Sequence, residues 1–351
     1  MTRHWSGAPP AMMPRHGACS TLFVGDGGVA MLRRSLLASP LLLAAVPARA
    51  EWVPKQPIHV IVGFAPGGTA DIAARIAGEA IQRRTGEIVV VDSKTGALGF
   101  IALKAVANAA PDGYTVGIGI MGSLAVAPVV PGTQIPLDLD KELLPICNLV
   151  GVPMALIVRP NAPYKTVAEL IAYAKENPGK VTYGSTGNGS TNQLGAELFA
   201  AEAGGLKLLH VPYRGGAPAI ADVATGQIDI FFANVSEIVG QIQSGQVRAL
   251  ALASSQPNPM VPDLPLLTKD IATLDINNWF GLVGPAGLPP DIAASLSKLF
   301  LDAINDPATA SLLASRGLVA VPQDGPAFKA AILKDRERWA KVVKQGNIKA
   351  E

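Results

Sequence analysis

The sequence contains few residues of the kinds that bind metals or form cross-links, with two cysteines and four histidines among 351 residues. One of the cysteines, Cys19, falls in an N-terminal leader described below, which leaves Cys147 without an internal disulfide partner. Histidine, cysteine and carboxylate residues do not occur together at the spacings typical of metal sites. We therefore expect no disulfide framework, no metal site and no cofactor.

Charged residues are also sparse, at 16% of the chain, and aromatic residues reach only 5%. The first 50 residues hold five of the 29 basic residues and one of the 27 acidic residues, which leaves 24 basic and 26 acidic residues in the remainder. A protein that binds nucleic acid needs a basic surface, and this nearly even balance does not supply one. We expect no nucleic-acid partner.

Long apolar runs are missing as well, since a membrane-spanning helix takes about twenty such residues. The apolar run at 36–46 is too short, but it follows a basic start at 31–34 and precedes the small-x-small sequence Ala48-Arg49-Ala50. This order is typical of a secretory signal peptide. We predict a signal peptide at 31–50, cleaved after Ala50, and a mature protein in the periplasm.

Residues 1–30 fit no export signal, because they place a glycine-, proline- and methionine-rich stretch before the basic start. We interpret them as the result of a start codon assigned too early, with Met31 as the true initiator. The pair Arg33-Arg34 also permits twin-arginine export, so both export routes stay open.

Apolar residues are abundant, at 49%, and 36 glycines and 29 prolines are spread between short periodic segments. From residue 51 onward β-branched runs alternate with amphipathic segments, beginning with a strand at 58–62, a helix at 69–84 and a strand at 88–91. This alternation predicts an α/β fold with mainly parallel sheets flanked by helices. Further helices are expected at 100–109, 166–177, 192–203, 217–224, 292–304 and 328–343. Further strands are expected at 114–120, 155–158, 181–183, 208–211, 228–232, 247–253 and 279–283.

The length predicts two α/β lobes, because one small domain would not use so much apolar material. We place the first lobe at 51–152 and 277–351 and the second at 153–276, with crossings near Pro153 and Asn277. The C-terminal helices are expected to return to the first lobe. Among the single elements, the helix at 166–177 is the best marked, because Thr166 and Glu169 form a capping box at its start.

Two glycine-rich loops each join a predicted strand to a predicted helix. The first glycine loop, 64–71, contains Gly67, Gly68 and Asp71, and its glycines allow close backbone approach to an anion at the helix start. An equally good interpretation is a tight turn in which Thr69 caps the helix and Asp71 complements the helix dipole.

The second glycine loop, 183–192, combines three glycines with many hydroxyl and amide side chains. Such a loop can surround a carboxylate with neutral donors, although a solvated polar loop is the alternative. Arg159 and Arg214 stand near strand ends, where either could pair with a carboxylate or simply face solvent.

Nucleotide binding and hydrolysis are two alternatives to carboxylate binding at these loops. The spaced glycines at 117–122 resemble a dinucleotide-binding pattern, but they lie within a predicted strand and open no helix, so we discount nucleotide binding. A small-molecule hydrolase that uses Ser185 with His210 is the alternative function, although no G-x-S-x-G elbow is present. His59 and His210 both fall in apolar strand patterns.

Several distinct motifs follow one another along residues 51–351. The motifs are Pro57-Ile58-His59-Val60-Ile61-Val62, the first glycine loop, Ala110-Pro111-Asp112-Gly113-Tyr114, residues 183–198, Val211-Pro212-Tyr213-Arg214-Gly215-Gly216-Ala217-Pro218-Ala219, and Phe280-Gly281-Leu282 before Pro285-Ala286-Gly287. In this order they closely resemble the Bordetella uptake gene family, the receptors of tripartite tricarboxylate transporters, and the resemblance covers nearly all of residues 51–351.

The resemblance implies a two-lobed periplasmic binding protein of type II, which closes on a small organic carboxylate in the cleft between its lobes and catalyses nothing. It implies that neutral groups hold the ligand, that a membrane permease of the transporter receives it, and that the protein acts as a monomer. The ligand-binding residues implied by the motifs are Ala65, Gly67, Gly68 and Asp71 in the first lobe and Ser185, Gly187, Asn188 and Ser190 in the second.

This chain departs from the family pattern at three places. Residues 92–96 read Asp-Ser-Lys-Thr-Gly where the family usually has asparagine, arginine, proline and glycine, Gln193 replaces a usual histidine, and Ala233 replaces a common acid before Asn234. These changes leave the expected fold in place but leave the identity of the carboxylate open.

Overall fold

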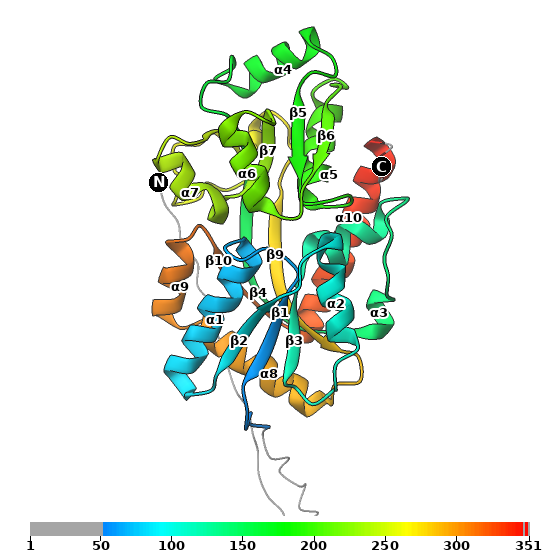
Figure 1. Cartoon of the computed structure of the whole chain (residues 1–351), viewed down its shortest axis with the longest axis vertical. Coiled ribbons are helices and arrows are strands. Elements are labelled where there is room, and N and C mark those ends of the chain that lie inside the picture. The colour runs from blue at the N-terminus through cyan, green and yellow to red at the C-terminus, as the bar shows by residue number, and fades with distance from the viewer. Residues whose placement is uncertain (1–51, 347, 350–351) are drawn as a thin grey trace, which may run out of the picture. The chain divides into compact units, whose positions relative to one another are not determined.

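The computed structural model describes residues 52–346 and 348–349 (Figure 1). The leader, the predicted signal peptide and the cleavage position after Ala50 lie outside these residues. The described chain forms a mixed α/β fold in which ten strands share one continuous sheet with the path β2-β1-β3-β9-β4-β7-β5-β6, while β8 and β10 both pair with β4.

One section of the sheet is built on three parallel strands near the N-terminus. β1 (Ile58–Val62) lies between β2 (Val89–Ser93) and β3 (Thr115–Ile120) and runs parallel to both. The connecting helices are α1 (Thr69–Thr85) and α2 (Phe100–Ala107). We call these strands, with β9, β10 and β4 up to residue 153, the first sheet section.

The second sheet section repeats this arrangement. β5 (Thr182–Ser185) lies between β6 (Leu209–Pro212) and β7 (Ile230–Asn234), parallel to both. It also contains β8 (Arg248–Ala253) and the end of β4. Its helices are α4 (Val167–Glu176), α5 (Thr191–Glu202), α6 (Gly216–Thr225) and α7 (Val235–Gln243).

The strand β4 (Leu143–Val158) runs through both sections (Figure 1). It pairs antiparallel with β9 (Asn277–Pro285) as far as Pro153, and from Met154 onward it pairs antiparallel with β7 and β8. The sheet is therefore parallel toward its outer strands and antiparallel at its centre. The sequence predicted only residues 155–158 of β4, because prolines rarely occur inside central strands. Pro145 fits at a register shift, and Pro153 fits where the partner strands change.

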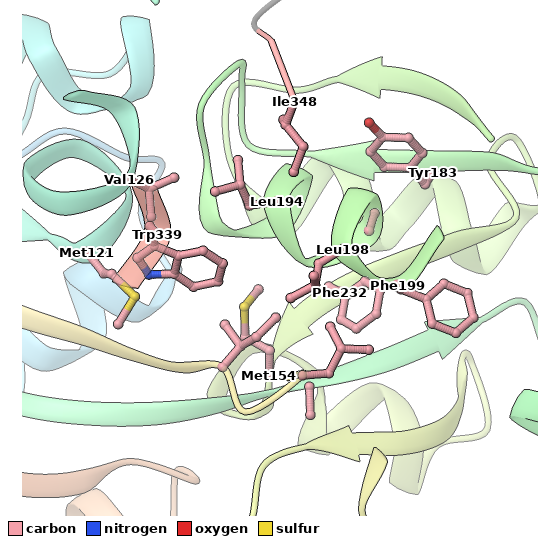
Figure 2. Close-up of a cluster of buried hydrophobic side chains, with 14 of the residues drawn as sticks. Met121, Val126, Met154, Tyr183, Leu194, Leu198, Phe199, Phe232, Trp339 and Ile348 are labelled. Atoms are coloured by element: carbon pink, nitrogen blue, oxygen red, sulfur yellow. The ribbon is translucent and has the colours of Figure 1, made fainter. Parts of the chain in front are cut away.

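The remaining elements complete the helical layers. α8 (Pro290–Ile304) and α9 (Pro307–Ala314) pack on α1 and on β10 (Val319–Asp324), beside the first sheet section. The short helix α3 spans Leu139–Glu142. α10 (Gly325–Gly346) contacts β4 and also reaches α5 of the second section. Figure 2 shows Trp339 of α10 beside Met121 and Val126, in a buried cluster that also contains Met154 and Leu194.

The Thr166 cap predicted for α4 is confirmed, but Glu169 accepts its return hydrogen bond from Lys165 and not from Thr166. Thr166 caps the helix by accepting a hydrogen bond from the Glu169 amide at 3.1 Å, while the Glu169 carboxylate accepts one from the amide of Lys165 at 2.6 Å. Elsewhere α7, α9 and β10 were not predicted. Within the described residues, no helix is both long enough and apolar enough to span a bilayer.

Candidate functional site

Two adjoining cavities lie where loops of the two sheet sections meet. The larger has a volume of about 370 Å³ and the smaller about 30 Å³, and both are lined by Phe64 of the first section and Thr186 of the second. The larger can hold a small organic molecule, whereas the smaller has room for little more than water. The larger cavity is lined by residues 63–64, 96–100, 132–134, 186–188 and 212–214.

The second glycine loop faces the larger cavity through its middle residues. Thr186, Gly187 and Asn188 line this cavity. Gly187 has a φ of +121°, which side chains other than glycine's rarely allow. The loop therefore presents backbone and amide groups to the cavity only because a glycine stands at this position.

The two serines predicted to bind ligand lie behind that surface. Ser185 is fully buried, and its Oγ accepts a hydrogen bond from the Gly187 amide at 3.1 Å and lies 2.6 Å from His210 Nε2. Ser190 is also buried and caps α5, accepting a hydrogen bond from the Gln193 amide at 3.2 Å. Both hydroxyls thus hold the loop in shape, and neither lines the two cavities.

The first glycine loop lies at the smaller cavity, which Ala65 and Gly68 line. The buried carboxylate of Asp71 accepts hydrogen bonds from the Gly67 amide at 3.0 Å and from Arg75 Nε at 2.9 Å. Asp71 therefore closes the loop on itself. The capping residue of α1 is Gly68, and not Thr69 as the tight-turn interpretation had it; Thr69 is the first residue of the helix.

The sequence predicted a possible anion site at the start of α1, and in the structure the carboxylate of Glu237 from α7 lies there. Its Oε1 accepts hydrogen bonds from the Thr69 amide at 3.0 Å, the Thr69 hydroxyl at 2.7 Å and Asn234 Nδ2 at 3.3 Å. The hydroxyls of Thr69 and Ser236 are also 2.8 Å apart. The sequence did not predict this contact, because α7 was not predicted and Glu237 is 168 residues from Thr69.

A second wall of the larger cavity is a turn at 96–99, which was also missed. Ala97 and Leu98 have φ values of 47° and 53°, in the left-handed region that disfavours residues other than glycine. The turn is held by a 2.6 Å hydrogen bond from Ser123 Oγ to the Leu98 carbonyl. It also packs so closely that a Cβ on Gly63 would lie 2.5 Å from the Gly99 Cα.

The charge of the larger cavity comes from Arg214. Among the described residues that line this cavity, Arg214 is the one charged side chain, and it is exposed. Burial and the carboxylate of Asp222, which accepts a hydrogen bond from the Tyr213 hydroxyl at 2.7 Å, raise the pKa of neighbouring Tyr213 to about 12, so Tyr213 stays neutral. Arg159 lies elsewhere, 4.0 Å from Asp229.

The Ser185 and His210 pair has the distance of a hydrogen bond but not the access of a nucleophile. The His210 ring stacks on Tyr183 at 4.9 Å, and Ser185 has no exposed surface through which a substrate carbonyl could reach its Oγ. The other histidine, His59, is exposed and lies 2.8 Å from Asp92. No His, Cys, Asp and Glu cluster able to hold a metal occurs in the described part of the chain.

The two remaining features discounted in the sequence also have structural explanations. Gly117 and Gly119 lie inside β3, where side chains would meet Val106 and Leu124. These glycines therefore serve packing. Cys147 is a buried free thiol on β4, and desolvation raises its pKa well above the usual range.

Residues 73–348 match the sequence model of the tripartite tricarboxylate transporter family receptor. Two relatives are a UPF0065 protein from the tcbD-tcbE intergenic region of Pseudomonas sp. strain P51 and the protein BugT of Bordetella pertussis. The first is 30% identical, covering 91% of this chain and 95% of its own length. BugT is 31% identical, covering 87% of this chain and 94% of its own length.

Three solved structures are also similar to this chain. A protein of R. palustris with adipate has a TM-score of 0.81 at 28% identity, covering 84% of this chain and 99% of that chain. The periplasmic binding protein BugD has a TM-score of 0.79 at 29% identity, covering 85% and 100%. MatC from Rhodopseudomonas palustris with bound malate has a TM-score of 0.78 at 26% identity, covering 83% and 100%.

Proposed function

Because the chain belongs to the receptor family of tripartite tricarboxylate transporters and is a solute-binding protein, we propose that it captures a small organic carboxylate in its larger cavity. The observation that carries this proposal is the pairing of Arg214 with the second glycine loop on one cavity of about 370 Å³. The carboxylates bound to two structural neighbours support the same chemistry.

In this proposal the carboxylate lies between Arg214 and residues 186–188. The Asn188 side-chain amide and the Arg214 guanidinium donate to its oxygens, and the guanidinium adds charge to that hydrogen bond. The Thr186 hydroxyl and the Gly187 amide, which donate to Asn192 Oδ1 at 2.6 Å and to Ser185 Oγ at 3.1 Å, hold the loop in shape. The resemblance implied chiefly neutral donors, so Arg214 is an addition to the residues that the resemblance implied. Gly187 and Asn188 remain ligand-binding residues in this proposal, while Ser185 and Ser190 support the loop.

We propose the lobes to be 51–152 with 277–351, and 153–276. The change of β4 partners between Pro153 and Met154 supports these boundaries, as does the hydrogen bond from the Met154 amide to the Ile276 carbonyl at 3.2 Å. The ligand would then lie between the lobes and favour their closed arrangement. Small-angle scattering should show a smaller radius of gyration when the ligand saturates the protein.

We further propose that the protein works in the periplasm as a monomer, hands its ligand to a membrane permease, and performs no catalysis. The burial of Ser185 supports binding over hydrolysis, because a nucleophile must be reachable. N-terminal sequencing of the exported protein should begin at Glu51.

Native mass spectrometry of the freshly purified mature protein is the direct test of capture. We expect one small organic acid per chain, released by mild unfolding, and calorimetric titration with that acid should give one site. Incubation should return the acid chemically unchanged. Conversion of the acid during incubation would favour the hydrolase, and absence of binding by any carboxylate would contradict the proposal.

A further inference from the structure

The two anion positions that the loops offer are not both available. At the start of α1, the Thr69 amide and hydroxyl already donate to Glu237, at 3.0 and 2.7 Å. Glu237 also lines the smaller cavity, which adjoins the larger one through Phe64 and Thr186. A second carboxylate at this position would find the Thr69 amide already donating to Glu237. It would also meet the like charge of Glu237 across the smaller cavity, which has little room for water to screen the repulsion.

The larger cavity offers one charged group and an apolar wall. Phe64, Leu98 and Phe100 line it, while Arg214 is the one charged residue among the described residues around it. A ligand whose far end carries a charge would have to bury that charge against this wall, which is costly without a partner. A hydrocarbon end would instead gain by leaving water.

We infer that the ligand carries a single carboxylate and an apolar body, and that Glu237 and Leu98 are the residues that select it. This inference rests on the proposed function, since it specifies which carboxylates the same cavity accepts. The carboxylate lies at Arg214 and residues 186–188, and the apolar body lies against Leu98 and Phe64. Glu237 excludes dicarboxylates.

Leu98 is assigned this role because its conformation is unfavourable for a leucine. A φ of 53° and ψ of 31° is unfavourable for a residue with a Cβ, and glycine would adopt the same turn freely. Strained residues of this kind cluster at ligand sites, where the surroundings hold them in place. The Ser123 hydrogen bond to Leu98 supplies such a restraint, and Leu98, which is 7% exposed, is among the residues that line the cavity.

Hexanoate and adipate test the inference, because both have six carbons and they differ only in the second carboxylate. Calorimetric titration of the ligand-free wild-type protein should show hexanoate binding at least tenfold more tightly than adipate. Glu237→Gln should reduce this ratio by about tenfold, because it removes the like charge. Glu202→Gln changes an exposed acid at the end of α5 and should leave the ratio as it is.

Chain length tests Leu98 separately. In the wild type, affinity should rise about tenfold from butyrate to hexanoate, and in Leu98→Ala this gain should fall to about threefold. Ile101→Ala, an exposed apolar change on α2, is the control and should keep the tenfold gain. Thermal unfolding of each variant checks that it folds.

The outcomes separate this inference from the proposed function. If adipate binds the wild type as tightly as hexanoate, or if the ratio is the same in Glu237→Gln, the inference is wrong while carboxylate capture stands. If no carboxylate of either series binds, the proposed function itself fails. The wild-type ratio alone decides the selectivity even if a variant does not fold.

Discussion

The two glycine loops have similar places in the fold and different surroundings. Both follow a parallel strand and lead into a helix, and both contain a glycine with positive φ, Gly67 at +83° and Gly187 at +121°. In the first loop the helix start donates to Glu237, and Asp71 closes the turn. In the second loop the corresponding turn is open to the larger cavity at residues 186–188.

The first loop shows that a helix start is no longer an anion site once a side chain of the same protein accepts its hydrogen bonds. Backbone amides at a helix start favour any carboxylate, including one from the same chain. Glu237 satisfies the first helix from a position 168 residues away in sequence. Local motifs alone therefore cannot separate a ligand site from an internal contact.

Substitution of Gly187 and Gly67 is the most direct test of whether the two loops differ in ligand binding. Gly187→Val should lower hexanoate affinity about hundredfold, about 2.7 kcal/mol, because valine cannot hold the φ of this turn. Gly67→Val imposes a similar backbone strain, although a Cβ at this position would meet no atom within 4 Å. Gly67 does not line the larger cavity. This second substitution should lower stability but leave affinity unchanged. Equal affinity losses in calorimetry would show that the loops do not differ in use.

The contact between the start of α1 and Glu237 can be weakened by substituting Thr69. Thr69→Val removes the hydroxyl that bonds Glu237 and Ser236 in a buried setting, and should lower the free energy of unfolding by about 2 kcal/mol. Urea unfolding measures this loss. Thr225→Val, at the exposed end of α6, should change stability by less than about 0.5 kcal/mol. A loss no larger than this control would mean that the cluster is not stabilising.

The charge on the open side is a smaller effect, because Arg214 is exposed. Arg214→Gln should weaken hexanoate binding about tenfold at low salt, and the difference from wild type should shrink at about 1 M salt, where screening is strong. Arg159→Gln is the matched control away from the cavity. Unchanged affinity in Arg214→Gln would mean that neutral groups alone bind the carboxylate.

The smallest effect concerns the capping serine of the second loop. Ser190→Ala should lower the free energy of unfolding by about 1 kcal/mol, as for other helix caps, and should leave affinity within about threefold because Ser190 lies behind the cavity surface. Ser244→Ala, at the exposed end of α7, serves as the stability control. A tenfold affinity loss in titration would place Ser190 in the binding surface after all.

Much of the fold was predictable because its signals are local. The strand at 58–62, the helix at 69–84 and the cap formed by Thr166 depend on nearby residues, and all three are confirmed. The first half of β4 was not predictable in this way. Its prolines look like interruptions until the register shift at Pro145 and the change of partners after Pro153 are known.

The candidate site was predictable to the level of its loops but not of its atoms. Sequence patterns pointed to residues 183–192, yet they could not tell that Ser185 turns inward to His210 while Gly187 faces the cavity. Leu98 gave no signal, because a left-handed leucine is defined by its tertiary contacts. Glu237 was hidden for the same reason, since its partner Thr69 is distant in sequence.

The unbroken passage of β4 between the two sheet sections has a mechanical consequence. Near Met154 the second crossing lies beside it, since Ile276 accepts from the Met154 amide at 3.2 Å and donates to the Ala253 carbonyl at 2.9 Å. Any rotation of one section against the other must therefore twist hydrogen-bonded chain, and twist stores elastic energy. The junction would therefore resist such a rotation more strongly than a single unpaired linker would.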